Sequence, residues 1–293
     1  MFDVLIAIGI LGVLGLIFGG VLAAASKIFY VETDPRLDKL NECLPGANCG
    51  GCGYAGCGGY AEAVLNGEAP IGKCASGGNE CAQAMAEIMG VEAGEVTRKV
   101  AMVRCSGEKV HDKDGNLISG AKVKANYEGF KDCLAASKVG GNGPISCKYG
   151  CLGFGSCVKA CKYDAIHVVN GVAKVNEDRC VGCLACANVC PRNLIIAVEP
   201  NRNVVIACNS MAKGAVTTRG CTVGCIGCGL CKKICPNGAI TVTNNLAVID
   251  YSKCDNCGLC ATVCPKHLIK DSNVENLPDP VVHSRNNPDA VAK

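Results

Sequence analysis

The stretch from residue 221 to residue 265 decides the fold, and it reads CTVGCIGCGLCKKICPNGAITVTNNLAVIDYSKCDNCGLCATVCP. Two runs of the pattern C-x2-C-x2-C-x3-C lie inside it, and a proline follows each run. The runs consist of Cys225, Cys228, Cys231 and Cys235, and of Cys254, Cys257, Cys260 and Cys264. Three thiolates two residues apart allow one short loop to bind three corners of a cube, while the fourth thiolate points in a new direction.

This spacing is the signature of a two-cluster ferredoxin, in which the fourth Cys of each run ligates the cluster of the other run. Structural zinc uses paired C-x2-C ligands and offers no role for a third Cys at the same interval. A disulfide framework is disfavoured because ligands packed this closely are a metal pattern. We therefore assign two [4Fe–4S] clusters, to Cys225, Cys228, Cys231 and Cys264, and to Cys235, Cys254, Cys257 and Cys260.

The composition favours small modules that are held together by metal. The chain has 293 residues, with 26 Cys, 37 Gly, 4% aromatic residues and no Trp, so one large hydrophobic core is not expected. Abundant cysteine without a cleavable secretory signal indicates a reducing compartment. The net charge of +3 and the pI near 7.9 are too mild to indicate a nucleic-acid partner.

The amino-terminal segment predicts a single transmembrane helix. Residues 4–25 read VLIAIGILGVLGLIFGGVLAAA, an apolar run without a charge that is long enough to span a bilayer. A signal peptide is the alternative, because Ala23-Ala24-Ala25 resembles a cleavage site. Asp3 in place of a basic residue argues against it, as does the length of the run. Lys27 and the later basic residues predict that the following modules face the cytoplasm at the cell membrane.

A four-Cys module follows the predicted anchor, with spacings of x2, x4 and x16. Its thiols lie among glycines whose backbone can approach sulfur closely, so one further [4Fe–4S] cluster is expected, with zinc as the alternative. The ligands would be Cys49, Cys52, Cys57 and Cys74. Cys43 and Cys81 fall outside the spacing, and a buried thiol that packs as a small hydrophobe is the expectation for Cys81.

The stretch from Cys147 to Cys190 repeats the cysteine pattern of residues 221–265 at one constant offset. Cys147 corresponds to Cys221, and Cys190 corresponds to Cys264. The match fails at one ligand, because Cys228 corresponds to Phe154, and we expect Cys147 to replace the missing thiol. The first repeat would then hold two clusters, on Cys147, Cys151, Cys157 and Cys190, and on Cys161, Cys180, Cys183 and Cys186. Lys162 stands where a proline is expected after Cys161.

Four cysteines remain that together would complete a sixth cluster: Cys105, Cys133, Cys208 and Cys221. The count alone supports this set, and free buried thiols are the alternative. The chain is thus expected to hold five [4Fe–4S] clusters, or six with this set.

The expected fold class is α+β, with two ferredoxin-like modules in tandem. Helices are expected at residues 58–65 and around Cys81 and Cys133. Strands are expected at residues 99–104, 166–169, 194–196, 240–242 and 268–269, and a turn at 111–116. The expected domains are an anchor (1–26), the four-Cys module (27–90), a connecting segment (91–143), two ferredoxin-like modules (144–200 and 201–270) and a mobile tail (271–293).

The order of anchor, four-Cys module and ferredoxin repeats resembles the B subunit of the Rnf complex, the bacterial ion-translocating ferredoxin:NAD⁺ oxidoreductase. The most specific piece is NCGGCGYAGC at residues 48–57, soon after a membrane anchor. The resemblance covers nearly the whole chain, although the compact form of the family has one two-cluster module. It implies an electron-transfer subunit that accepts electrons from reduced ferredoxin, while other subunits carry flavin, the NAD site and the ion pathway.

The chain itself shows no substrate site beyond electron transfer. No G-x-G-x-x-G follows an expected strand, so a dinucleotide site is unsupported. Two other function classes remain, an electron-transfer subunit of another membrane oxidoreductase such as a hydrogenase, and a zinc scaffold without redox chemistry. A basic docking face for an acidic ferredoxin is a further hypothesis, and it rests on Lys148, Lys159, Lys162, Lys232 and Lys233.

Overall fold

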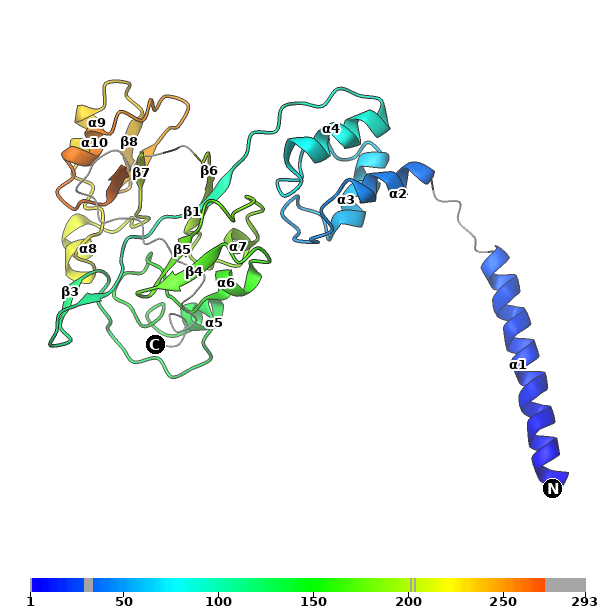
Figure 1. Cartoon of the computed structure of the whole chain (residues 1–293). Coiled ribbons are helices and arrows are strands. Elements are labelled where there is room, and N and C mark those ends of the chain that lie inside the picture. The colour runs from blue at the N-terminus through cyan, green and yellow to red at the C-terminus, as the bar shows by residue number, and fades with distance from the viewer. Residues whose placement is uncertain (1, 29–33, 201, 203, 272–293) are drawn as a thin grey trace.

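A computed structural model of the chain describes residues 2–28, 34–200, 202 and 204–271 (Figure 1). It is a mixed α+β structure, in which every sheet among the described residues has two strands. The expected mobile tail, residues 271–293, lies outside the described residues apart from Asp271.

The amino-terminal run forms helix α1 (Phe2–Ile28). Among the residues described, none of the helices combines the length with the hydrophobicity that crossing a bilayer requires. The membrane span that the sequence predicts for residues 4–25 stays a prediction.

Three helices build the four-Cys module: α2 (Pro35–Glu42), α3 (Cys57–Leu65) and α4 (Gly78–Met89). The expected helices at residues 58–65 and around Cys81 are thus confirmed. Asp34 caps α2 by accepting a hydrogen bond from the Arg36 amide. A small core of Leu40, Tyr60 and Met85, all fully buried, holds the three helices together.

The first ferredoxin-like module contains α6 (Ser156–Ala160), the hairpin β4 (Ile166–Val169) and β5 (Val172–Val175), α7 (Ala185–Asn188) and β6 (Ile195–Val198). Strand β1 (Val100–Val103) pairs antiparallel with β6, so Val103 faces Ile195 in the register. The expected strand at 99–104 is confirmed. It contributes to the first module although it lies in the segment that the sequence predicts as a connection.

The second module repeats the first element by element. It contains α9 (Leu230–Ile234), β8 (Ile240–Thr243), β9 (Leu246–Ile249), α10 (Leu259–Thr262) and β10 (Ile269–Asp271). Each element starts at the repeat offset from its counterpart, so that position 230 corresponds to 156 and position 269 to 195. Strand β7 (Val204–Ile206) pairs with β10 as β1 pairs with β6. The duplication that the cysteine spacing predicts is therefore confirmed in the structure.

The segment between the four-Cys module and the first ferredoxin-like module packs across both repeats. It forms the hairpin β2 (Val110–His111) and β3 (Leu117–Ser119), with the expected turn between them, and the short helix α5 (Cys133–Lys138). Single bridges join Ala121 to Cys221 and Val123 to Ile145. Helix α8 (Gly214–Gly220) leads from β7 into the second module.

The four-Cys module lies against the first ferredoxin-like module (Figure 1). The Lys162 ammonium donates hydrogen bonds to the carbonyl oxygens of Ala47 and Asn48. A Cβ at Gly51 would overlap the carbonyl oxygen of Cys183, so the two backbones touch at a position that requires glycine.

A substitution at Gly120 tests the packing of the segment between the four-Cys module and the first ferredoxin-like module. Its φ is +107°, and a Cβ there would overlap the Glu108 carbonyl oxygen. We expect Gly120→Ala to destabilise the protein by more than about 3 kcal/mol, because strain and a backbone clash add. Gly115→Ala is the matched control, since Gly115 has a φ of +81° with open space around it, and should cost about 1 kcal/mol. Thermal unfolding followed by circular dichroism measures both, and equal midpoints would contradict the prediction.

Candidate metal centres

Five cavities among the described residues are each lined by at least four cysteines. They have similar sizes, between about 330 and 380 Å³ with the open space at their mouths included. Cysteine thiols are the shared feature of linings that are otherwise mostly apolar side chains and backbone.

The N-terminal cavity is lined by the four thiols that the sequence groups together, Cys49, Cys52, Cys57 and Cys74. Helix α3 begins at Cys57, whose amide donates a hydrogen bond to Asn48 Oδ1 at 2.8 Å. Cys183 of the first ferredoxin-like module also lines this cavity. The four-Cys module thus opens directly toward its neighbour.

The second module brings one of its two expected groups of thiols together around a cavity. The second inner cavity is lined by Cys225, Cys228, Cys231 and Cys264. The remaining thiols of the two runs form what we call the second outer group: Cys235, Cys254, Cys257 and Cys260. Cys260 is buried in the core of the module, and Cys235 and Cys254 pack against that core.

The first module also brings one expected set together. The first outer cavity is lined by Cys161, Cys180, Cys183 and Cys186. The first inner cavity contains Cys151, Cys157 and Cys190, and its fourth thiol belongs to Cys133. The structure therefore places Cys133 where the sequence led us to expect Cys147.

Hydrogen bonds between α5 and α6 explain the position of Cys133. Asp132 caps α5, and its carboxylate also accepts a hydrogen bond of 2.6 Å from the Ser156 hydroxyl. The Cys133 amide donates to the same hydroxyl oxygen at 2.8 Å. These contacts fix the start of α5 against the start of α6, which carries Cys157. A sequence search could have noticed the capping Asp132, but not its partner 24 residues away.

The junction cavity is lined by Cys105, Cys147, Cys208 and Cys221. Three of these thiols belong to the spare set that the sequence predicts. Cys147 takes the place that we expected for Cys133, so the structure exchanges these two residues between neighbouring sites. The cavity lies between the two ferredoxin-like modules, and α8 contributes Thr217 to its wall.

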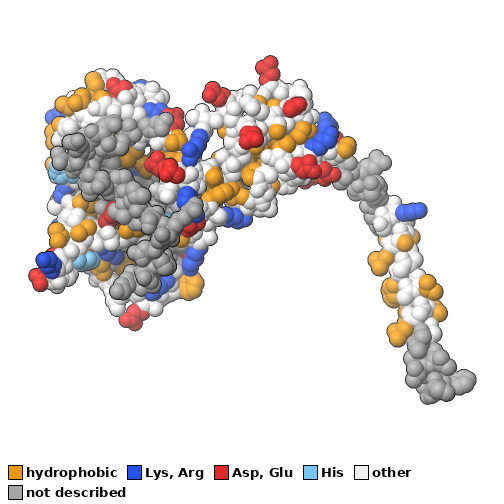
Figure 2. Space-filling view, in the orientation of Figure 1, with side chains coloured by type: hydrophobic (Ala, Val, Ile, Leu, Met, Phe, Trp, Pro, Cys, Tyr) orange, Lys and Arg blue, Asp and Glu red, His pale blue; other side chains and the backbone are white. Residues whose placement is uncertain are grey.

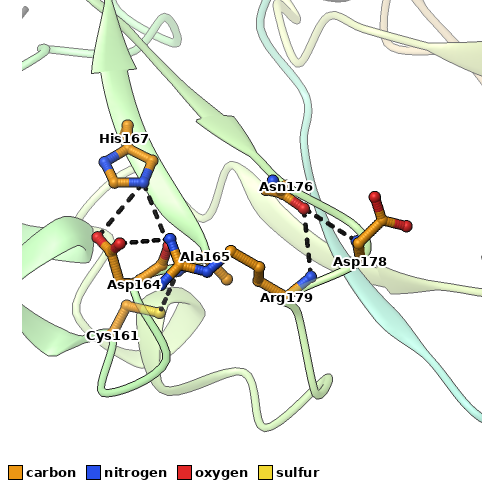
Figure 3. Close-up of polar contacts among 7 residues, drawn as sticks. All are labelled: Cys161, Asp164, Ala165, His167, Asn176, Asp178 and Arg179. Carbon is orange, nitrogen blue, oxygen red and sulfur yellow. Dashed lines mark hydrogen bonds and ion pairs between the residues drawn. The ribbon is translucent and has the colours of Figure 1, made fainter. Parts of the chain in front are cut away.

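Figure 3 shows how polar contacts hold the loops of the first outer cavity. The Ala165 amide donates to Cys161 Sγ at 3.4 Å. Asp164 has a positive φ of 48° and forms an ion pair with Arg179, next to Cys180. Asn176 Oδ1 accepts a hydrogen bond from the Arg179 amide at 3.2 Å. The loop that carries Cys161 is therefore tied to the loop that carries Cys180.

Burial and backbone amides set the electrostatics of the thiols. Burial raises the pKa of Cys105, Cys157 and Cys186 to about 12, so these groups are protonated at neutral pH unless a cation replaces the proton. The Ala101 amide donates to Cys180 Sγ at 3.3 Å, which is the kind of contact that stabilises a bound thiolate.

Two further thiols lie beside the N-terminal cavity. A Cβ at Gly77 would lie 2.7 Å from Cys81 Sγ and 3.4 Å from Cys74 Sγ, so these two sulfur atoms flank one glycine. A hydrogen bond from the Cys81 thiol lowers the pKa of Cys74 to about 6. Cys81 is buried in the core, against which Cys43 also packs. Cys81 therefore packs as a buried thiol, as the sequence predicts, and it also contacts the candidate ligand Cys74.

The five lysines of the predicted docking face lie in different environments. Lys162 binds the four-Cys module, and Lys159 lies over the Phe130 ring at 5.7 Å. Lys148, Lys232 and Lys233 are exposed. Lys232 and Lys233 lie in the last turn of α9, beside the thiols of the second module.

These sites fit [4Fe–4S] clusters by the chemistry of their donors. At least four cysteines line each cavity, the rest of the lining is mostly apolar, and backbone amides donate to several sulfur atoms. No group of three or more Cys, His, Asp or Glu residues in the described ranges converges as the ligands of a single metal ion do. A cluster of this kind supplies one-electron redox chemistry when it is bound.

Comparisons with known proteins give the same cofactor class. Residues 44–76 match an Fe-S cluster family, residues 173–196 match the 4Fe-4S binding domain, and residues 224–268 match the 4Fe-4S dicluster domain. These matches cover the N-terminal cavity, part of the first module and the second module. They indicate several 4Fe-4S clusters in this chain.

Similar proteins match over most of the chain. The B subunit of the Na⁺-translocating ferredoxin:NAD⁺ oxidoreductase complex of Acetobacterium woodii is 45% identical, over 86% of this chain and 73% of that protein. The B subunit of the proton-translocating complex of Clostridium ljungdahlii is 42% identical, over 87% of each chain. The B subunit of the ion-translocating oxidoreductase complex of Methanosarcina acetivorans is 38% identical, over 85% of this chain and 90% of that protein.

The exchange of Cys133 and Cys147 can be tested by counting iron in double variants. If Cys133 and Cys157 bind the same cluster, Cys133→Ala with Cys157→Ala should lose about four iron atoms, as either single variant does. Cys147→Ala with Cys157→Ala should lose about eight, because two sites are broken. Iron and acid-labile sulfide are measured on anaerobically prepared protein. The reverse pattern would restore Cys147 to the first inner cavity.

Proposed function

The chain belongs to the family of the B subunits of ion-translocating ferredoxin:NAD⁺ oxidoreductase (Rnf) complexes, and we propose that it carries electrons from reduced ferredoxin into such a complex. The observation that carries the proposal is the set of thiol-lined cavities in each of the three modules. Electron transfer is the chemistry that such thiol sites serve when they hold iron–sulfur clusters.

Five [4Fe–4S] sites follow from the cavities and from the repeat. They are the N-terminal cavity, the first outer and first inner cavities, the second inner cavity and the second outer group. The contact between modules supports a route through them, because Cys183 lines both the N-terminal cavity and the first outer cavity. We propose that electrons enter at the second module and leave through the four-Cys module toward the other subunits.

The protein residues contribute burial, hydrogen bonds and a fixed placement of the thiols. Backbone amides that donate to sulfur, such as Ala101 to Cys180 and Ala165 to Cys161, favour the more negative, reduced state of a bound cluster. Buried apolar walls shield the sulfur atoms of buried ligands such as Cys157 and Cys180, and the pairing of β1 with β6 keeps Ala101 in place beside Cys180. No proton has to move for this chemistry.

The exposed end of the second module is the proposed docking site for ferredoxin. Cys228 and Cys257 are exposed there, and the lysines of α9 provide positive charge next to them. The proposed partner is an acidic ferredoxin, so opposite charges would steer the encounter.

The docking site can be tested by charge reversal. Lys232→Glu with Lys233→Glu should slow the reduction of the chain by reduced ferredoxin at low ionic strength by about tenfold or more, because the attraction becomes repulsion. Lys113→Glu with Lys138→Glu, on exposed residues elsewhere, changes the net charge equally and should have little effect. Stopped-flow absorbance measures the rate, and dithionite as the reductant checks that the clusters are intact. Equal rates for the two double variants would refute the docking site.

We also propose that α1 anchors the chain in the membrane of the complex, with the iron–sulfur modules on the cytoplasmic side. The support is the uncharged run of residues 4–25 together with the exposure of its large apolar side chains, which are visible along the helix in Figure 2. Leu11, Leu16 and Leu22 are 70%, 79% and 69% exposed. Apolar side chains in this number find a favourable environment in lipid or against other membrane helices.

Removal of residues 1–26 tests the anchor. The full chain should sediment with membranes and resist a carbonate wash, whereas the shortened chain should remain in the soluble fraction with its iron content unchanged. The other subunits should co-purify with the full chain from detergent, and co-purification with a hydrogenase instead would favour the alternative assignment. A shortened chain that still resists the wash would contradict the proposed anchor.

A further inference from the structure

The junction cavity joins thiols from four separate segments of the chain. We propose that Cys105, Cys147, Cys208 and Cys221 form a sixth [4Fe–4S] site, which takes one cysteine from each repeat and one from the loop after each recruited strand, β1 and β7, and connects the two ferredoxin-like modules. The inference rests on the iron–sulfur chemistry proposed above, but it does not depend on the complex or on the electron donor.

One pair of thiols comes from equivalent positions of the two β-strand pairs. Val103 of β1 faces Ile195, and Ile206 of β7 faces Ile269, which is the counterpart of Ile195 in the second repeat. The two strands therefore occupy the same place in their modules. Cys105 and Cys208 each follow the last residue of their strand by two positions. They are structural counterparts, although they do not stand at the repeat offset and the sequence therefore hides their equivalence.

The other pair, Cys147 and Cys221, does stand at the repeat offset. Each repeat with its recruited strand therefore provides one thiol after that strand and one thiol before its cluster run. A site that has two thiols from each of two such equivalent units is approximately two-fold symmetric. Cys133 has no cysteine counterpart in the second repeat, since position 207 is Ala and the run there has its own second Cys, Cys228. Only the set with Cys147 therefore shows this symmetry.

Hydrogen bonds connect both halves of the site to the neighbouring cavities in the same way. The Cys151 amide donates to Cys105 Sγ at 3.4 Å, and the Cys225 amide donates to Cys208 Sγ at 3.3 Å. Cys151 and Cys225 are themselves equivalent residues, and they line the first inner and the second inner cavity. On each side of the junction, one backbone amide therefore links a junction thiol to a proposed ligand of the neighbouring inner cavity. Ser210 adds a second amide to Cys208 Sγ at 3.5 Å.

Two cations hold the loops that carry the other pair of thiols. Arg192 Nη1 donates to the Cys147 carbonyl oxygen at 2.8 Å, and Lys266 Nζ donates to the Thr222 carbonyl oxygen at 3.0 Å. Arg192 and Lys266 are again equivalent positions of the two repeats. Four thiolates make a cluster site anionic, so cations at both ends favour its occupancy. Buried free thiols would give no reason for matching amides and matching cations in both repeats.

The position of the site completes a single file of cavities. Cys183 lines both the N-terminal and the first outer cavity, and amide hydrogen bonds connect the junction to the first inner and second inner cavities. Within each module, thiols of the inner and outer sets belong to one core. Without the junction site, the two modules would face each other across a void lined by thiols. The site would supply one-electron redox chemistry at that point.

Iron counts on the anaerobically prepared full chain test the site. Cys208→Ala and Cys147→Ala should each lose about four iron atoms, and the double variant should lose the same four because both residues bind one cluster. Cys208→Ala with Cys133→Ala should lose about eight, because these residues belong to different clusters. Cys43→Ala is the control, and its iron content should match that of the unmodified chain.

Three outcomes would overturn the inference: unchanged iron in Cys208→Ala, a loss of about eight iron atoms in the Cys147 and Cys208 double variant, or loss of one zinc ion instead of iron. If Cys208→Ala does not fold, Cys208→Ser decides, because it keeps the size of the side chain. It should alter or remove the EPR signal of one cluster, and an unchanged spectrum would overturn the site. A chain that keeps its iron but does not accept electrons from ferredoxin would refute the proposed function and leave this inference intact.

Discussion

The arrangement of four thiols around a void is the constraint on which the rest of this structure depends. The chain has few aromatic residues, and its hydrophobic cores are small and include the thiols themselves, as Cys225, Cys231 and Cys260 show in the second module. Short helices and two-stranded sheets of this size bury too little apolar surface to be stable alone. Metal ligation therefore contributes to folding as well as to redox chemistry, and a substitution at a ligand is expected to affect both.

Duplication places two equivalent modules on either side of the junction cavity. The two ferredoxin-like modules share every helix and strand at one offset, and each recruits an additional strand, β1 or β7, from outside its cysteine run. The loops after these strands bring Cys105 and Cys208 to the same cavity. The connection between modules is thus made by residues that a single ferredoxin-like module does not need. The four-Cys module contacts the first ferredoxin-like module in a different way, through Gly51 and Lys162.

Burial and nearby positive charge set the electrostatics of the thiols, and the groups that supply the charge differ from one site to the next. Burial raises the pKa of thiols such as Cys157, so iron has to replace the proton before the sulfur can act as a ligand. Backbone amides at Cys105, Cys180 and Cys208 then provide fixed partial positive charge, and Arg192 and Lys266 provide full charges at the junction. Because amides and cations differ between the sites, the cluster potentials are expected to differ along the file.

The sequence by itself determined the modules, the repeat and those sites whose thiols lie in one run. Three ligands at x2 intervals lie in one loop, so their proximity is a local property that spacing reveals, as for Cys225, Cys228 and Cys231. Only the tertiary structure decided which cavities Cys133 and Cys147 line, because neither residue shares a cavity with the thiol nearest to it in the sequence. The decision depends on the hydrogen bonds of Asp132 and Ser156, and on strand pairings that bring Cys105 and Cys208 together. These contacts join segments far apart in the chain, and cysteine spacing carries no information about them.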